Sequence, residues 1–145
     1  MDASIQSVLL NVADLEKSIT FYRGVFDFPV VSQRERSAAL LVNEHNRRQV
    51  ILLREVGASA LHSGRGTIGP RLLAFELSSP EELELIEQGL QQRHALLRHE
   101  RTETYEAVLG VDPDRIEISA ASSLTGTPIS NEDWHAINGS VFAID

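Results

Sequence analysis

The sequence predicts an α+β fold in which two βαβββ modules form an open half-barrel. Near the N-terminus, an alternating apolar segment is followed at once by helical spacing. The same strand-then-helix order restarts in the second half, and a glycine-rich stretch, residues 57–70, separates the two. We expect modules at about residues 4–56 and 71–121, forming one domain of residues 1–121, with residues 57–70 as a linker or a flexible cover over a site.

The composition is typical of a soluble globular protein. The chain has 145 residues, of which 42% are hydrophobic and 23% charged, enough for one domain with a core. Its formal net charge of −8 repels phosphate backbones, so we expect no nucleic-acid partner. No apolar run approaches the roughly 20 residues of a membrane span, and no signal peptide opens the chain, so we expect no membrane partner and a cytoplasmic location.

Cysteine is absent from the sequence. This excludes a disulfide framework, a thiolate zinc site and a cysteine nucleophile. Serine, histidine and aspartate are present, but no nucleophile-elbow motif accompanies them.

The first module begins with a strand at residues 7–12, in which apolar Val8, Leu10 and Val12 alternate with the remaining side chains. Asp14 is a suitable N-cap for the helix that follows. The apolar residues of this segment have helical spacing: Leu15, Ile19, Tyr22, Val25 and Phe26. Three further strands are expected at residues 28–33, 37–43 and 49–56, so the module is βαβββ.

The second module repeats this order without close sequence identity. A strand at residues 71–77 precedes a helix with Ser79 as N-cap, Pro80 at the first position and Glu82 completing a capping box. Three more strands follow, at residues 94–100, 104–111 and 114–121.

The tail, residues 122–145, lies outside the repeat. Ser130 can cap a short helix over residues 131–138. We expect the tail to be pinned to the body of the protein by Trp134, Ile137, Val141 and Phe142. An interface with a partner subunit is the alternative.

Two motifs carry a resemblance to a known family. The segment "SVLLNVADLEKSITFYRGVFDF" and the later "DPDRIEI" resemble the vicinal oxygen chelate superfamily, which includes glyoxalases, bleomycin-resistance proteins and extradiol dioxygenases. "LLAFEL" followed by "SSPEEL" looks like the start of the second module of that family. The resemblance covers residues 4–121, and it implies a half-barrel of paired modules and a homodimer.

The same resemblance implies a divalent-metal site, with one ligand from an early strand and one from a late strand of each module. In this sequence those positions hold Ser7, Leu52, Leu72 and Glu117, and only Glu117 can be a ligand. A catalytic metal needs about three protein ligands. We therefore predict no resident cofactor and disfavour a divalent metal. The "DPD" turn also lacks the glycine and asparagine that follow it in the family, a two-residue shortening before Glu117.

The five histidines do not offer a replacement metal site. They are His45, His62, His94, His99 and His135, and none forms a helical ligand pair. His94 and His99 are an odd number of residues apart, so a regular strand directs them to opposite faces. We interpret them as surface histidines.

The predicted concave face is apolar with a few polar groups. Its predicted ligand-binding residues are Ser7, Leu9, Asn11, Leu52, Arg54, Leu72, Glu76, Tyr105 and Glu117. Such a mixture suits a small organic molecule. The alternative for Glu76 and Glu117 is that they pair with arginines, such as Arg54 or Arg71, and only close the barrel.

The sequence is compatible with two functions. The first is a metal-independent protein that binds a small, partly apolar molecule, as bleomycin-resistance proteins do. The second is a lyase or dioxygenase with a rebuilt or metal-free site, in which Glu117 or Glu76 is the general base. Fold alone does not decide whether the protein is an enzyme.

Overall fold

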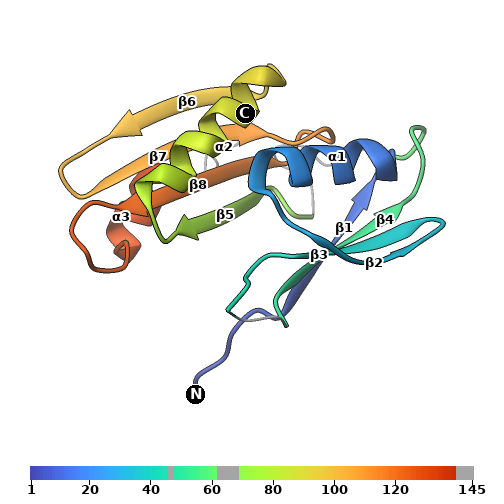
Figure 1. Ribbon diagram of the computed structural model, residues 1–145, viewed down its shortest axis with the longest axis horizontal. Helices are drawn as coiled ribbons and strands as arrows, with labels where there is room; N and C mark the ends of the chain where they lie inside the picture. The colour runs from blue at the N-terminus through green and yellow to red at the C-terminus, as the bar shows by residue number, and fades with distance from the viewer. Residues whose placement is uncertain (46–47, 62–68, 140–145) are drawn as a thin grey trace. The chain divides into compact units, whose positions relative to one another are not determined.

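The computed structural model describes residues 1–145 except 46–47, 62–68 and 140–145 (Figure 1). The first half contains β1 (Ser7–Val12), α1 (Leu15–Phe26), β2 (Val30–Arg34), β3 (Ser37–Leu41) and β4 (Val50–Glu55). The second contains β5 (Leu72–Leu77), α2 (Pro80–Gln92), β6 (Leu96–Arg101), β7 (Tyr105–Val111), β8 (Glu117–Ser123) and α3 (Asn131–Ile137). The predicted βαβββ order is thus confirmed in both halves.

The chain divides into two compact units, residues 1–61 and 62–145. The division falls inside the stretch predicted as a linker, and the tail belongs to the second unit. Half of the predicted linker, residues 62–68, lies outside the described residues.

The first unit is a four-stranded sheet in the order β1-β4-β3-β2, with α1 packed on one face. β1 runs parallel to β4, and the other neighbouring strands are antiparallel. Leu10 and Val12 are buried on the helix side, as their alternation predicts. Tyr22 of α1 is fully buried. The apolar stripe of the helix and the alternating strand therefore form one core.

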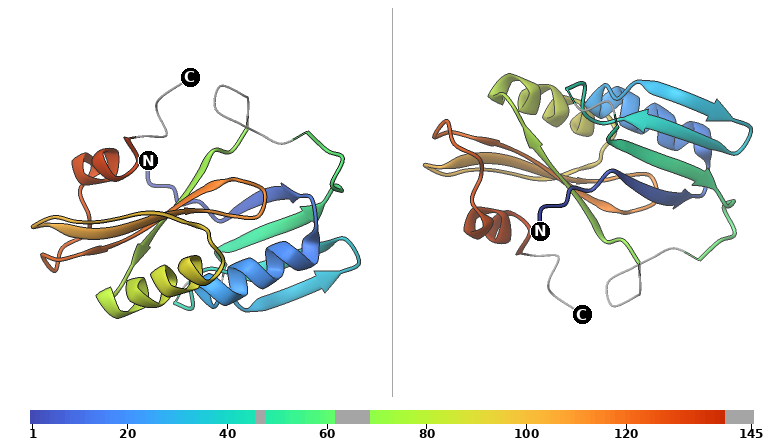
Figure 2. Two further views of the ribbon diagram at one scale, coloured as in Figure 1. Left: turned by 90° about the horizontal axis from the view of Figure 1, so that it is seen from above. Right: turned by 90° about the horizontal axis from the view of Figure 1, so that it is seen from below.

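The second unit repeats this topology in the order β5-β8-β7-β6, again with one parallel pair, β5 and β8. α2 and α3 lie on opposite faces of this sheet (Figure 2). Leu90 of α2 contacts the sheet at Gly110, so even-numbered residues of β7 there face α2. α3 covers part of the other face. Among the described residues of the first unit, no helix corresponds to α3.

The three predicted N-caps are confirmed. The side chain of Asp14 accepts a hydrogen bond from the Lys17 backbone N–H at 3.1 Å. The Ser79 and Ser130 hydroxyls accept equivalent bonds at 3.4 and 3.0 Å. Each cap satisfies an N–H that has no partner within its helix. The predicted capping box expects the Glu82 carboxylate to accept from the Ser79 backbone N–H. The bond that the structure gives this carboxylate comes instead from the Ser78 hydroxyl, at 3.1 Å.

Each sheet has an irregularity in one edge strand, β2 in the first sheet and β6 in the second. The pairing of β2 with β3 shifts between Val30 and Ser32, and the pairing of β6 with β7 shifts between Leu96 and Arg98. The residues inside the two shifts, Val31 and Leu97, are apolar and exposed. A bulge of this kind inserts one extra residue into the edge strand.

The "DPD" motif forms the turn that leads into β8. The buried Asp112 carboxylate accepts hydrogen bonds from the backbone N–H groups of Asp114 and Ile116, at 2.8 and 2.9 Å. Arg115 has φ 66°, a left-handed conformation that favours glycine. Arg115 thus closes the turn in the left-handed region, and Glu117 becomes the first residue of β8.

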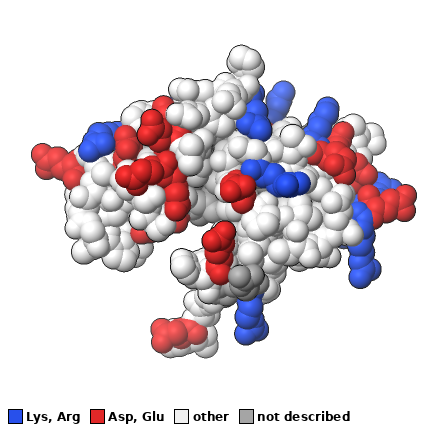
Figure 3. All heavy atoms as spheres, in the orientation of Figure 1, with Lys and Arg blue, Asp and Glu red and all other residues white. Residues whose placement is uncertain are grey.

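No helix in the part of the chain that the structure describes combines the length and the apolar character needed to cross a membrane. On the face drawn in Figure 3, acidic and basic side chains are interspersed. The described lysines and arginines form no continuous basic area on that face.

Candidate ligand-binding faces

Each sheet has a helix face, covered by α1 or α2, and a far face on the opposite side. On the far face of the first sheet, strand pairing sets Ser7 beside Val50, Leu9 beside Leu52 and Asn11 beside Arg54. The alternation that we predicted for β1 is confirmed: Leu10 and Val12 are buried, and Leu9 is 48% exposed. An apolar pair and a polar pair therefore lie next to each other on this face.

Arg54 and Asn11 form a specific contact across β4 and β1. The Arg54 Nε–H donates to the Asn11 Oδ1 at 2.9 Å. Both side chains belong to exposed residues, and Ser37 of β3 is the neighbour of Arg54 on the other side. The amide satisfies one guanidinium donor and carries no net charge to neutralise the cation.

On the far face of the second sheet, the sequence-predicted residues Leu72, Glu76, Tyr105 and Glu117 come together on three adjacent strands. Leu72 is paired with Glu117, and Glu76 with Ala121. The grouping that the sequence predicted within this module is therefore present.

The C-terminal tail covers part of this second far face. Trp134 and Ile137 of α3 pack on a buried cluster, as predicted, whereas Val141 and Phe142 lie outside the described residues. The cluster comprises Tyr105, Ala107, Leu109, Ala121, Ile129 and Ile137. The tail is thus part of the core of the second unit.

Polar contacts hold the tail at three points. The Ile129 backbone N–H donates to the Glu76 Oε2 at 3.2 Å. The Arg98 Nη2 donates to the Ile137 carbonyl at 3.1 Å, and the Thr104 hydroxyl donates to the Asp133 Oδ2 at 2.8 Å. Glu76, predicted as a ligand contact, therefore has a structural partner in the tail.

Tyr105 is buried beneath this tail, with 5% of its surface exposed. Its hydroxyl donates to the Glu100 Oε1 at 3.1 Å. Burial, reinforced by the negative charge of Glu100 and by this hydrogen bond, raises the pKa of the Tyr105 phenol above its ordinary value of 10.0. Ligand contact at Tyr105 stays a prediction, and the tail would have to move to permit it.

Glu117 is paired with Arg71, with 3.8 Å between its Oε1 and the Arg71 Nη2. Both side chains are largely buried, at 17% and 20% exposure. The Glu117 backbone N–H also donates to the Arg71 carbonyl at 3.1 Å. Of the arginine pairings suggested by the sequence, the one between Arg71 and Glu117 is confirmed, whereas Arg54 pairs with an amide.

The strand register corrects one position. Glu117 lies opposite Leu72, and the equivalent partner of Ser7 is Val50 rather than Leu52, which lies opposite Leu9. The sequence estimate was displaced because the turn before β4 differs in length from the turn before β8, and pattern alone does not fix register. The corrected residue is still apolar, so the set of metal donors is unchanged.

Sequence reasoning missed Ser119. It lies two residues after Glu117 on the same face and is fully buried. Its hydroxyl has no hydrogen-bond partner among the residues that the structure describes. The alternation of β8 counted from Glu117 would have placed it on this face.

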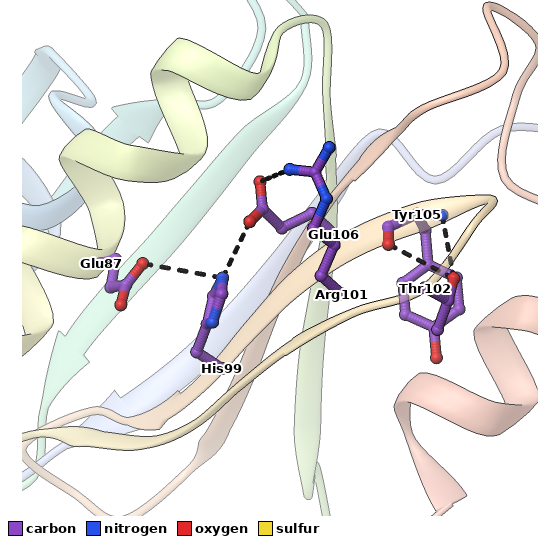
Figure 4. Close-up of polar contacts among 6 residues, drawn as sticks. All are labelled: Glu87, His99, Arg101, Thr102, Tyr105 and Glu106. Carbon is purple, nitrogen blue, oxygen red and sulfur yellow. Dashed lines mark hydrogen bonds and ion pairs between the residues drawn. The ribbon is translucent and has the colours of Figure 1, made fainter.

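His99 lies on the helix face of the second sheet, close to two acidic side chains (Figure 4). Its Nε2 is 2.9 Å from the Glu106 Oε2 and 4.0 Å from the Glu87 Oε2 of α2. Arg101 also approaches Glu106, with 3.6 Å between nitrogen and oxygen. Within the described ranges, no group of three His, Asp or Glu side chains could hold a metal ion.

The geometry agrees with comparisons with known proteins. A sequence model of the Glyoxalase/Bleomycin resistance protein/Dioxygenase superfamily matches residues 4–120. None of the curated proteins matches the chain.

Solved structures of this type share the fold at low sequence identity. A glyoxylase/bleomycin resistance protein/dioxygenase domain from Frankia sp. EAN1pec has a TM-score of 0.73 at 20% identity, covering 88% of this chain and 96% of that one. Lactoylglutathione lyase from Agrobacterium tumefaciens has 0.62 at 17%, covering 84% and 95%. The fosfomycin resistance protein FosX from Listeria monocytogenes has 0.63 at 17%, covering 86% and 97%.

Proposed function

Since the chain belongs to the Glyoxalase/Bleomycin resistance protein/Dioxygenase superfamily, we propose that it binds a small, partly apolar organic molecule without a resident divalent metal. The binding surface in this proposal is the far face of the first sheet. The observation that carries the proposal is the donor set at the expected metal positions.

That donor set does not fit a divalent metal. Ser7, Val50 and Leu72 occupy three of the four positions, and two of these side chains have no donor atom. The fourth residue, Glu117, is already paired with Arg71. A catalytic metal needs about three protein ligands, and these four positions offer fewer.

The choice of the first sheet rests on a difference in cover. Its far face presents Leu9, which is 48% exposed, beside Leu52 and the Arg54–Asn11 pair. The corresponding face of the second sheet is partly covered by α3. A face with apolar surface and a few oriented polar groups is suited to a small ligand. A second argument comes from the structural neighbour FosX, which is named for resistance to fosfomycin.

Metal analysis tests the first half of the proposal. The full chain is incubated with Mn²⁺, Fe²⁺, Ni²⁺ and Zn²⁺ in turn, desalted and measured by elemental analysis. We expect less than stoichiometric metal in every case. A stoichiometric ion that is lost in Glu117→Ala would overturn the metal-independent proposal.

Ligand binding tests the second half. Naphthoate and naphthamide, one charged and one neutral aromatic probe, are titrated against the full chain while the melting temperature is recorded. We expect a saturable rise with at least one of them, because a ligand that binds only the folded state stabilises it. Leu9→Asn should weaken the response, and Leu61→Asn, at a fully exposed leucine of the same unit, should not.

Catalysis of the lyase or dioxygenase type is the alternative. Its candidate bases already have structural partners, since Glu117 pairs with Arg71 and Glu76 accepts the Ile129 N–H. Turnover of a hemithioacetal or a catechol that Glu117→Gln abolishes without loss of folding would favour this alternative.

The expected homodimer remains part of the proposal. Multi-angle light scattering of the full chain at several concentrations checks it directly. A monomer at all concentrations would contradict it and would leave the ligand-binding surface of the first unit unaffected.

A further inference from the structure

We propose that Arg54, oriented by Asn11, recognises a carboxylate on the bound molecule, so that the ligand is a small aryl or alkyl carboxylic acid. This inference rests on the proposed function and adds the chemical class of the ligand. It is carried by the geometry of Arg54, by the charges around it and by its apolar neighbours.

The geometry fixes one edge of the guanidinium. Arg54 and Asn11 are register partners on parallel strands, and the Arg54 Nε–H donates to the Asn11 Oδ1 at 2.9 Å. That bond uses one of the five N–H donors of the group. A guanidinium held in one orientation loses less conformational entropy when it binds a ligand, and its remaining donors suit a planar carboxylate.

The charge environment distinguishes Arg54 from four other arginines of the molecule. Arg36, Arg71, Arg98 and Arg101 each have a carboxylate within 4 Å, which belongs to Glu55, Glu117, Glu100 and Glu106 respectively. The partner of Arg54 is instead a neutral amide. In a chain of net charge −8, an arginine held by an amide keeps its positive charge available to an anion.

The apolar neighbours of Arg54 indicate the chemical character of the remaining part of the ligand. Leu9 and Leu52 are paired with each other and precede Asn11 and Arg54 by two residues on the same face. Two residues along a strand span roughly 7 Å. A carboxylate attached to an aromatic ring or a short alkyl chain would therefore reach the guanidinium while its apolar part covers the leucines.

The size of the charge favours a carboxylate over a phosphate. A single guanidinium balances one negative charge, and the net charge of −8 opposes a dianion. If the protein bound phenylphosphonate but not naphthoate, the assignment of a carboxylate ligand would be wrong.

Isothermal titration with matched probes and variants tests the inference. Asn11→Asp has the shape of asparagine but places a carboxylate on the guanidinium, and Arg54→Gln removes the charge. Because a hydrogen bond to a charged group is a strong one, we expect each variant to weaken naphthoate binding roughly tenfold or more. Binding of naphthamide should change by less than about twofold, given that it carries no charge.

Arg23→Gln is the matched control, since Arg23 is an exposed arginine of α1 on the other side of the same unit. Naphthoate affinity should be unchanged in this variant and should fall with added salt in the wild type. Circular dichroism and urea unfolding verify that each variant is folded, and Arg54→Gln serves where Asn11→Asp does not fold.

The outcomes separate this inference from the proposed function. If naphthoate and naphthamide bind equally well, or if both Asn11→Asp and Arg54→Gln leave naphthoate binding intact, carboxylate recognition is wrong and small-molecule binding stands. If neither probe binds, both proposals fail. Selective loss of naphthoate in the two variants supports both.

Discussion

The two halves of the molecule have the same strand order and the same pattern of parallel and antiparallel pairing, yet their far faces differ. In the first unit, the far face carries the 48% exposed Leu9. In the second unit, the tail packs Ile137 onto the equivalent face and leaves that residue 0% exposed. The repeated topology therefore determines the scaffold, and the segment outside the repeat determines which far face is partly covered.

The helix faces differ as well. Leu40 lies opposite Ile51 in the first sheet, and Gly110 lies opposite Ile118 at the equivalent place in the second. A Cβ at Gly110 would come within 2.7 Å of the Ala95 carbonyl oxygen. The second sheet thus approaches the end of α2 too closely for any side chain, whereas the first fills the same position with a buried leucine.

Truncation on the two far faces should produce the largest contrast. Ile137→Ala should lower the free energy of unfolding by about 2–5 kcal/mol, because it leaves a cavity in a fully buried cluster. Leu9→Ala should change it by less than about 0.5 kcal/mol. Urea denaturation measures both. Equal effects would mean that the two far faces are not covered differently.

Gly110→Ala tests the close approach at α2. We expect a loss of about 1–3 kcal/mol, because the added methyl group collides with the Ala95 carbonyl and with Leu90. The control is Gly139→Ala, where a Cβ would meet nothing within 4 Å. A neutral Gly110→Ala would show that the helix can shift away from the sheet without loss.

Tyr105→Phe tests the burial of the second far face through the pH dependence of the free energy of unfolding. Since the pKa of Tyr105 is raised above 10.0, the unfolded state loses its proton first, and stability falls as pH rises through that range. At pH 8, the variant should be less stable by about 1 kcal/mol, because the hydrogen bond to Glu100 is lost. The difference should shrink above pH 10, as urea titrations at pH 8 to 11 would measure. Parallel pH profiles would contradict a buried Tyr105.

The smallest effects concern a feature that both units share. Asp27 and His94 follow α1 and α2 in left-handed conformations, with φ of 57° and 54°. Glycine at either position should raise the unfolding free energy by roughly 0.5 kcal/mol, because it adopts this conformation without strain. Thermal unfolding detects the change.

Salt separates the two glycine variants. The Asp27 carboxylate faces the negative end of the α1 dipole, so part of the gain in Asp27→Gly should disappear at high salt. The gain in His94→Gly should not depend on salt in this way, because histidine has no carboxylate to interact unfavourably with the helix dipole. Equal salt dependence would contradict a dipole contribution.

Local chemistry made much of the scaffold predictable. The caps at Asp14, Ser79 and Ser130 involve side chains and N–H groups three residues apart, so sequence alone contains both partners. The alternation of β1 likewise identified which residues are buried. These features depend on spacing within one element, and spacing is what a sequence displays.

Contacts between segments that are distant in the sequence were not predictable in the same way. The contact of Glu76 with the Ile129 N–H joins residues 53 positions apart, and the register that places Val50 opposite Ser7 joins residues 43 positions apart. The alternation correctly grouped Asn11 with Arg54, but their direct hydrogen bond depends on that register. Pairing across distant segments is decided by packing, which a pattern within one segment does not contain.

The bulges at Val31 and Leu97 have a consequence for solubility at high concentration. β2 and β6 are outermost in their sheets, where a straight strand would offer its backbone to another chain. Each bulge interrupts the regular spacing of those groups, so a flat incoming strand cannot match them over its full length. An apolar side chain is exposed at each bulge, and regular strand pairing along these two edges is interrupted.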